Sequence, residues 1–168
     1  MSPDHTDASR PRVHAFADDA LGTHDAVGLV EALHAGEVSI PEVVEAAIAR
    51  AAEVEPTLNG IVLETYDRAR AQARDPRPGY FAGVPTLIKD LVDVAGMPTM
   101  HGTDAWVPRR HSVDGDFARM FLATGLVPLG KSRLPEYGFV PATFHTRQGA
   151  VPTPWDPTRT AGGSSSGS

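Results

Sequence analysis

Two stretches near the start of the chain carry apolar residues at helical spacing. Over residues 25–35 the apolar positions fall on one face of a helix, and Gly36 is a residue type that commonly ends one. The second stretch opens with Ser39-Ile-Pro-Glu42, a capping-box pattern with a proline in the first turn, where proline is tolerated. We predict a helix from there to about Val54, closed by Pro56.

Short apolar runs follow the helical stretches. Residues 61–63, after an Asn-Gly turn, are expected to form a strand, and the polar, alanine-rich residues 66–74 a surface helix. Residues 86–88 predict a buried strand with Lys89 at its end.

The second half of the chain continues this alternation up to Pro135. Residues 114–124 predict a helix with one apolar face, and residues 126–129 predict the next strand. The apolar face is formed by Phe117, Met120 and Phe121. Because helices alternate with short strands, we predict an α/β fold. We expect the strands near residues 86 and 127 to be parallel, side by side or one apart, with a right-handed crossover through the helix. We predict no element beyond Pro135.

Composition and charge narrow the class of protein. The chain has 168 residues, 41% of them hydrophobic, which is enough for a core of moderate size. A formal net charge of −6 argues against binding to nucleic acid or membrane through bulk charge. The absence of cysteine excludes disulfides, thiolate zinc sites and a cysteine nucleophile. With no apolar leader or membrane-spanning run, we expect a cytoplasmic protein with flexible residues 1–22 and a folded unit over residues 23–168.

Residues 125–132 match the phosphate-binding pattern G-x-x-x-x-G-K-[ST]. That site needs a strand before the first glycine and a helix after the lysine. Here a helix is predicted before Gly125, and Pro135 follows closely. Pro128 also lacks one of the backbone N–H groups that would cradle a phosphate. A buried strand that ends at Gly130 is therefore favoured over a nucleotide-binding loop.

The histidines do not show the spacing of a metal site. Three lie ten residues apart, and three others have no convincing carboxylate partner nearby in the sequence. They are His14, His24 and His34, and His101, His111 and His145. We expect histidines on the surface or in loops, and no metal.

Only two of the 15 basic residues are lysines, Lys89 and Lys131. Lys89 follows the predicted buried strand. Burial disfavours the charged form of an amine, and a neutral amine can act as a general base. The alternative is a structural lysine that pairs with Asp90 or Asp93, or that reaches solvent along its stem.

Residues 162–168 read Gly-Gly-Ser-Ser-Ser-Gly-Ser. Glycine lets backbone amides approach a substrate closely, and serine hydroxyls can relay protons. The same composition is typical of a flexible linker or a cloning scar. Composition alone favours the linker.

Taken together, three segments in this order resemble the amidase signature family. They are Phe81-Ala-Gly-Val-Pro-Thr-Leu-Ile-Lys-Asp90, Leu129-Gly-Lys-Ser-Arg-Leu-Pro-Glu-Tyr-Gly138, and Pro154-Trp-Asp-Pro-Thr-Arg159 leading into residues 162–168. The resemblance extends from about residue 25 to the end. It implies a mixed sheet flanked by helices, and hydrolysis of amide C–N bonds through an acyl-enzyme by a Ser–cis-Ser–Lys triad. It also implies a small-molecule amide substrate and no cofactor.

By this resemblance Lys89 is the general base, and Ser164, the first serine after the double glycine, is the relay serine. Gly162, Gly163 and Ser165 are the residues that it assigns to substrate binding.

The resemblance also shows two departures. The family's nucleophilic serine and glycine-rich oxyanion turn lie further along than Ser168, so the chain is expected to be the N-terminal part of an amidase domain and inactive alone. Ser166 stands where the family usually has glycine, and serine is unfavourable wherever a positive φ is needed. The alternatives are a non-catalytic remnant that binds a ligand or partner and, more distantly, the nucleotide-binding loop. The substrate, a partner subunit that channels ammonia, and a homo-oligomer all stay open.

Overall fold

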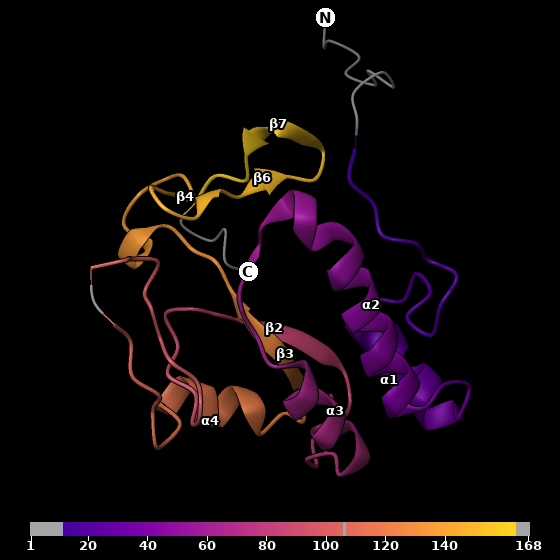
Figure 1. The fold of residues 1–168 in the computed structure, drawn as a ribbon. Helices are drawn as coiled ribbons and strands as arrows, with labels where there is room; N and C mark the ends of the chain where they lie inside the picture. The colour runs from indigo at the N-terminus through magenta and orange to yellow at the C-terminus, as the bar shows by residue number, and fades with distance from the viewer. Residues whose placement is uncertain (1–11, 106, 164–168) are drawn as a thin grey trace, which may run out of the picture.

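The computed structural model describes residues 12–105 and 107–163. Two helices, α1 (Ala26–Ala35) and α2 (Ile40–Leu58), lie side by side along one edge of the molecule (Figure 1). The Asp25 carboxylate caps α1 by accepting hydrogen bonds from the backbone N–H groups of residues 27 and 28, and Gly36 ends it with φ of 70°. The predicted capping box between Ser39 and Glu42 is present at the start of α2.

The predicted end of α2 is wrong. The helix runs through Pro56 to Leu58, and Asn59 closes it in the left-handed conformation with φ of 48°. Proline removes one backbone donor from the last turn, but the Glu55 carboxylate holds this end in place. It accepts hydrogen bonds from the N–H groups of Gly60 and Ile61 at 3.0 and 2.9 Å. These two local hydrogen bonds offset the loss of one helical hydrogen bond.

Three strands form the central sheet, in the order β1-β3-β2. They are β1 (Ile61–Glu64), β2 (Pro85–Lys89) and β3 (Val127–Ser132). β2 and β3 are parallel neighbours, as the sequence predicted, and β1 runs antiparallel to β3. Between β2 and β3 the chain passes through α4 (Asp116–Leu122), which lies across one end of the molecule (Figure 1).

The middle strand, β3, is buried along its whole length. Gly130 lies at its closest approach to β1, where a Cβ atom would be 2.0 Å from the carbonyl oxygen of Leu63. Only glycine fits at that distance. The pairing of β3 with both neighbours is irregular near this residue, so the side chains after the irregularity change face.

The prediction that residues 86–88 are a buried strand is only partly right. Among the described residues β2 has a neighbouring strand on one side only, and of residues 86–88 only Ile88 is fully buried. Leu87 is 37% exposed. An edge strand buries one face less completely than a central one, and an apolar run does not distinguish the two positions.

The predicted apolar face of α4 is also wrong. The small Ala118 and Leu122 are buried against Ile88, whereas Phe117 and Met120 are 61% and 72% exposed. Phe121 is half-buried and stacks on Phe117 at a centroid distance of 5.5 Å. Close approach of the short helix to the sheet selects its small side chains rather than its largest ones.

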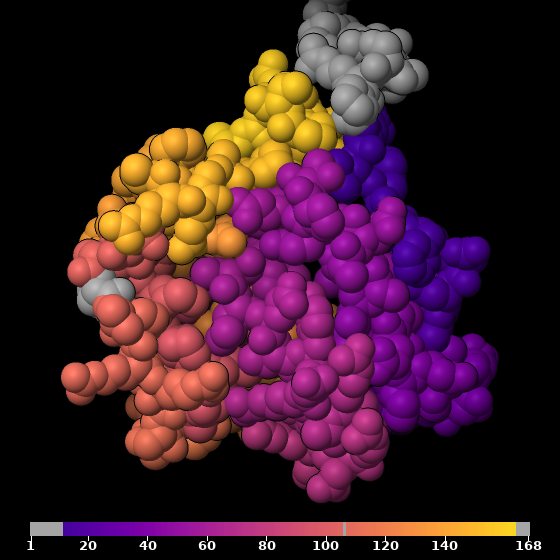
Figure 2. Space-filling view, viewed as in Figure 1, coloured from indigo at the N-terminus to yellow at the C-terminus, as the bar shows by residue number. Residues whose placement is uncertain are grey.

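The remaining elements are short. Helix α3 (Tyr66–Arg74) matches its prediction. After β3 come a 3-10 turn (Glu136–Gly138) and two hairpins, formed by β4 (Phe144–His145) with β5 (Gly149–Ala150), and β6 (Pro152–Thr153) with β7 (Asp156–Thr160). These hairpins lie against the end of α2 (Figure 2). They were not predicted, because three of the four strands have only two residues and show no alternation, and β7 (Asp156–Thr160) has no apolar residue apart from a proline.

The described part of the N-terminal segment lies against the rest of the fold. Asp19 makes an ion pair with Arg50 of α2 at 2.5 Å, and the Val13 N–H donates to the carbonyl oxygen of Pro154 at 2.9 Å. Residues 1–11 of the segment expected to be flexible lie outside the described residues. No helix within the described ranges is long and apolar enough to cross a membrane.

Candidate active site

The carboxyl ends of the parallel strands β2 and β3 meet at one edge of the sheet. Lys89 is the last residue of β2 and is in register with Ser132, the last residue of β3. Lys89 is half-buried at the end of an open apolar groove of about 520 Å³ along the free side of β2. In open parallel sheets this is the end at which ligands bind.

The fully buried lysine of the chain is Lys131, not Lys89. The ammonium Nζ of Lys131 donates to the carbonyl oxygen of Pro98 and to Thr99 Oγ1, both at 2.7 Å, and lies 3.3 Å from Asp90 Oδ1. Neither Lys131 nor Asp90 has any exposed side-chain surface. The predicted alternative paired Lys89 with Asp90 or Asp93. In the structure the ion-pair partner of Asp90 is Lys131. Asp93 lies 3.1 Å from His111 Nε2.

Asp90 connects the end of β2 to the loop over residues 97–103. Its Oδ2 accepts a hydrogen bond from the Met100 N–H at 3.0 Å, and its backbone carbonyl accepts from the His101 N–H at 3.2 Å. Its own N–H donates to the carbonyl oxygen of Ser132. Burial raises the pKa of the Asp90 carboxyl and lowers the pKa of the Lys131 amine, while each charge opposes the shift of its partner.

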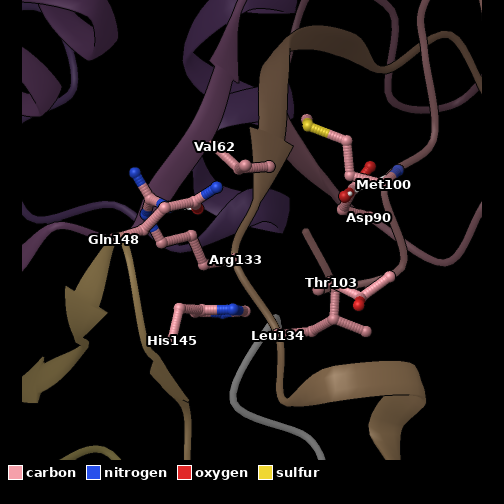
Figure 3. A pocket seen from close by; sticks show the side chains of 9 residues that line it. Val62, Asp90, Met100, Thr103, Arg133, Leu134, His145 and Gln148 are labelled. Atoms are coloured by element: carbon pink, nitrogen blue, oxygen red, sulfur yellow. Dashed lines mark hydrogen bonds between the residues drawn. The ribbon is translucent and has the colours of Figure 1, made fainter. Parts of the chain in front are cut away.

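A small cavity of about 10 Å³, room for about one water molecule, lies beside this pair. Figure 3 shows Arg133, His145 and Gln148 on one side of it, and Asp90 with the neighbouring loop on the other. His145 is only 7% exposed, and its Nε2 atom has no hydrogen-bond partner within the described part of the chain. The prediction of a surface or loop histidine is therefore wrong for His145, which β4 carries into the interior beneath Arg133.

The double glycine before the serines lies beside the segment that follows β3. Gly162 has φ of 85° and accepts a hydrogen bond from Thr143 Oγ1 at 3.1 Å. A Cβ atom on Gly163 would lie 2.8 Å from Pro135 Cγ and 2.8 Å from the carbonyl oxygen of Val140. This turn therefore needs glycine for two reasons, a left-handed backbone and a close approach. The predicted site residues Ser164 and Ser165, and Ser166, lie outside the described residues.

Two non-glycine residues with left-handed backbones meet next to the site, and no sequence pattern indicated them. His101 and Tyr137 have φ of 54° and 50°, and the Tyr137 N–H donates to the carbonyl oxygen of His101 at 2.8 Å. Their rings stack at 6.0 Å. Left-handed residues with side chains are uncommon and cluster at functional sites.

The phosphate-binding pattern does not form a loop. Its lysine and serine, Lys131 and Ser132, are the last two residues of the buried strand β3, and the chain turns into Pro135 without starting a helix. The strand extends two residues past its predicted end at Gly130. No backbone cradle at a helix N-terminus exists here, so the nucleotide-binding alternative is wrong. Within the described ranges no three metal-ligating side chains gather into a group.

Comparison with known proteins identifies the family. The Amidase family model matches residues 42–168. The putative amidase AmiC of Mycobacterium leprae is 56% identical over 157 residues, which cover 94% of this chain and 34% of the relative. The 6-aminohexanoate-cyclic-dimer hydrolase of Paenarthrobacter ureafaciens is 35% identical over 147 residues, 86% of this chain and 30% of that protein.

Solved structures agree with this assignment. A structure of 6-aminohexanoate cyclic dimer hydrolase superposes with a TM-score of 0.78 at 35% identity, over 86% of this chain and 30% of that one. A bacterial aryl acylamidase of the amidase signature family gives 0.75 at 31% identity, over 86% and 32%. The chain thus spans about a third of the length of the relatives it matches. On the family model and these identities, the chain belongs to the amidase family.

Proposed function

We propose that the chain is part of an enzyme that hydrolyses carboxylic amide C–N bonds, with Lys89 as the general base and Ser164 as the relay serine. One observation carries the proposal. Lys89 is in register with Ser132, and three residues further on Pro135 contacts Gly163, the residue directly before Ser164. Lys89 and the glycine pair that precedes Ser164 are therefore held at the same edge of the sheet. Membership of the amidase family supports the reaction class.

The chemistry follows the logic of an activated nucleophile. The other serine of the triad, which the family resemblance assigns to a position beyond Ser168, gives its proton to Ser164, which gives its own to the amine of Lys89. The serine oxygen bonds to the amide carbonyl carbon, the C–N bond breaks, and the leaving amine takes the proton back. Water then hydrolyses the resulting ester. The backbone amides of Gly162, Gly163 and Ser165 are suited to orient the substrate carbonyl.

The test joins residues 1–168 to the remaining two thirds of a relative, the AmiC protein of Mycobacterium leprae. The joined protein is assayed on a panel of aliphatic and aromatic amides. Lys89→Met keeps the volume of the stem and removes the amine, and Ser164→Ala removes the relay. Each is expected to lower kcat by about a thousandfold or more, as the loss of one member of a triad does.

Arg119→Met is the matched control, because it removes a cation that is 70% exposed on α4. It should leave turnover unchanged. Near-normal turnover of the Lys89→Met protein would exclude Lys89 as the base. The 168-residue chain alone should show no enzymatic turnover. If it binds amides and the joined protein never hydrolyses them, the non-catalytic alternative is correct.

A further inference from the structure

The buried ion pair between Asp90 and Lys131 lies one residue away from Lys89 along β2. We infer that Asp90 and Lys131 are positioning residues, which hold the end of β2 and the loop over residues 97–103 so that the Lys89 amine keeps a fixed place. This inference rests on the proposed role of Lys89 as the base. The pair would act on Lys89 through the backbone and not through a direct contact.

The register of the sheet places the pair and Lys89 on opposite faces. Lys131 is in register with Ile88, and Lys89 with Ser132. Because side chains alternate along a strand, Asp90 lies on the face of Ile88, and Lys89 lies on the other. Ile88 packs with Met97. Lys131 binds the carbonyl group of the next residue, Pro98, which agrees with this assignment. The pair therefore contacts the strand end on one face of the sheet, and the Lys89 side chain lies on the other face.

The hydrogen bonds of the pair are directed at the loop. The Lys131 ammonium group donates to Pro98 and Thr99, and it makes an ion pair with Asp90 Oδ1 at 3.3 Å. The second carboxylate oxygen of Asp90 binds the N–H of Met100. Three consecutive residues of the loop are thus held by two side chains from the ends of β2 and β3.

General stability is a poor reason for this arrangement. Removing two charges from water is costly, and apolar residues of similar volume often replace a buried pair without loss of stability. What a buried pair anchored to a loop adds is one defined geometry. Lys89 and Lys131 are the chain's only lysines, and they lie on neighbouring strands at one sheet edge. Their side-chain signals can therefore report on this geometry.

The test uses the 168-residue chain labelled with ¹³C at lysine Cε. Two lysine side-chain signals are expected, and Lys89→Arg assigns them. In Asp90→Asn and in Lys131→Met the Lys89 signal should move, although neither change removes an atom of Lys89. Exchange of the Met100 amide proton should become at least about tenfold faster than in the parent chain, because its acceptor, the Asp90 carboxylate, has lost its charge or its anchor.

Leu122→Ala is the matched control. Leu122 is 1% exposed in the apolar cluster that includes Ile88 of β2, and its side chain has no polar atom that could bind the pair. It should lower stability and leave the Lys89 signal in place. If a single charge variant does not fold, the uncharged double variant Asp90→Leu with Lys131→Met replaces it, since it leaves no unpaired charge.

The inference fails if the Lys89 signal is the same in the parent and in a folded variant without the pair. A Lys89 signal that moves equally in Leu122→Ala also overturns it, because the pair would then act through stability alone. Neither result depends on amide hydrolysis. A failure of the Lys89→Met assay would remove the proposed function without changing the measured link between the pair and the position of Lys89.

Discussion

Gly130 is the residue at which one added methyl group should do the most damage to the sheet. It lies in the middle strand, between Glu64 of β1 and Leu87 of β2. In Gly130→Ala the new Cβ atom would be 2.0 Å from the carbonyl oxygen of Leu63, whereas real Cβ atoms essentially never come within 3.0 Å of such an atom. β1 and β3 must therefore move apart by at least about 1 Å.

The expected loss of stability follows from that displacement. Overpacking of a rigid site costs about 1–3 kcal/mol. The Thr65 N–H donates to the carbonyl oxygen of Leu129 at 2.8 Å, and a strand separation larger by 1 Å breaks this bond, at about 1 kcal/mol. We therefore expect a decrease of about 2–4 kcal/mol in the free energy of unfolding. This is a large share of the roughly 5–15 kcal/mol that is usual for a domain.

Urea unfolding followed by circular dichroism measures this difference. Gly60→Ala is the matched control, because a Cβ atom there would meet only the Glu55 carboxylate, at 3.8 Å, and the backbone is not left-handed. It should change the free energy of unfolding by less than about 0.5 kcal/mol. Equal midpoints for Gly130→Ala and Gly60→Ala would refute the reasoning, because β1 and β3 would then accommodate a Cβ atom at a position where the structure leaves no space for one.

Two further predictions concern packing and pH. Leu122→Ala should cost about 2–5 kcal/mol in urea unfolding and Met120→Ala less than about 0.5, because Leu122 is 1% exposed and Met120 is 72% exposed. The reverse order would support the face predicted from sequence. The Arg50 guanidinium lowers the pKa of the Asp19 carboxyl below its ordinary value of 3.8. The ion pair therefore stabilises the fold above pH 3.8, and this stabilisation is lost as the pH falls through the lower pKa of the folded state. Asp19→Asn should therefore lower Tm at neutral pH and converge with the parent below pH 3.8; a difference that persists in acid would show that the ion pair is not its cause.

Features encoded by neighbouring residues could be predicted from the sequence. The caps at Asp25 and Ser39 act within three residues, so the starts of α1 and α2 were evident. The parallel pairing of β2 with β3 followed from one helix between two apolar runs, because the handedness and length of such crossovers leave few alternatives.

Features decided by distant partners could not be predicted. Nothing near Lys131 in the sequence indicates that its ammonium group is buried, because its acceptors on Pro98 and Thr99 lie 33 and 32 residues earlier in the chain. The burial of His145 likewise depends on a hairpin whose strands are too short to show a period. The family resemblance assigned Lys89 the role of general base from a sequence motif alone. It gave no indication of the ion pair between Asp90 and Lys131.

The contact between α2 and the C-terminal hairpins has a consequence for the order of folding. Asn59 Nδ2 donates to the carbonyl oxygen of Gln148, 89 positions further along the chain. At usual rates of synthesis of about 5–20 residues per second, these 89 residues take roughly 4–18 seconds to make. During that interval the end of α2 has no hairpin to cover it. The glycine turn follows the hairpins along the chain and is made after them, and ribosome-associated chaperones have seconds in which to bind the uncovered end of α2.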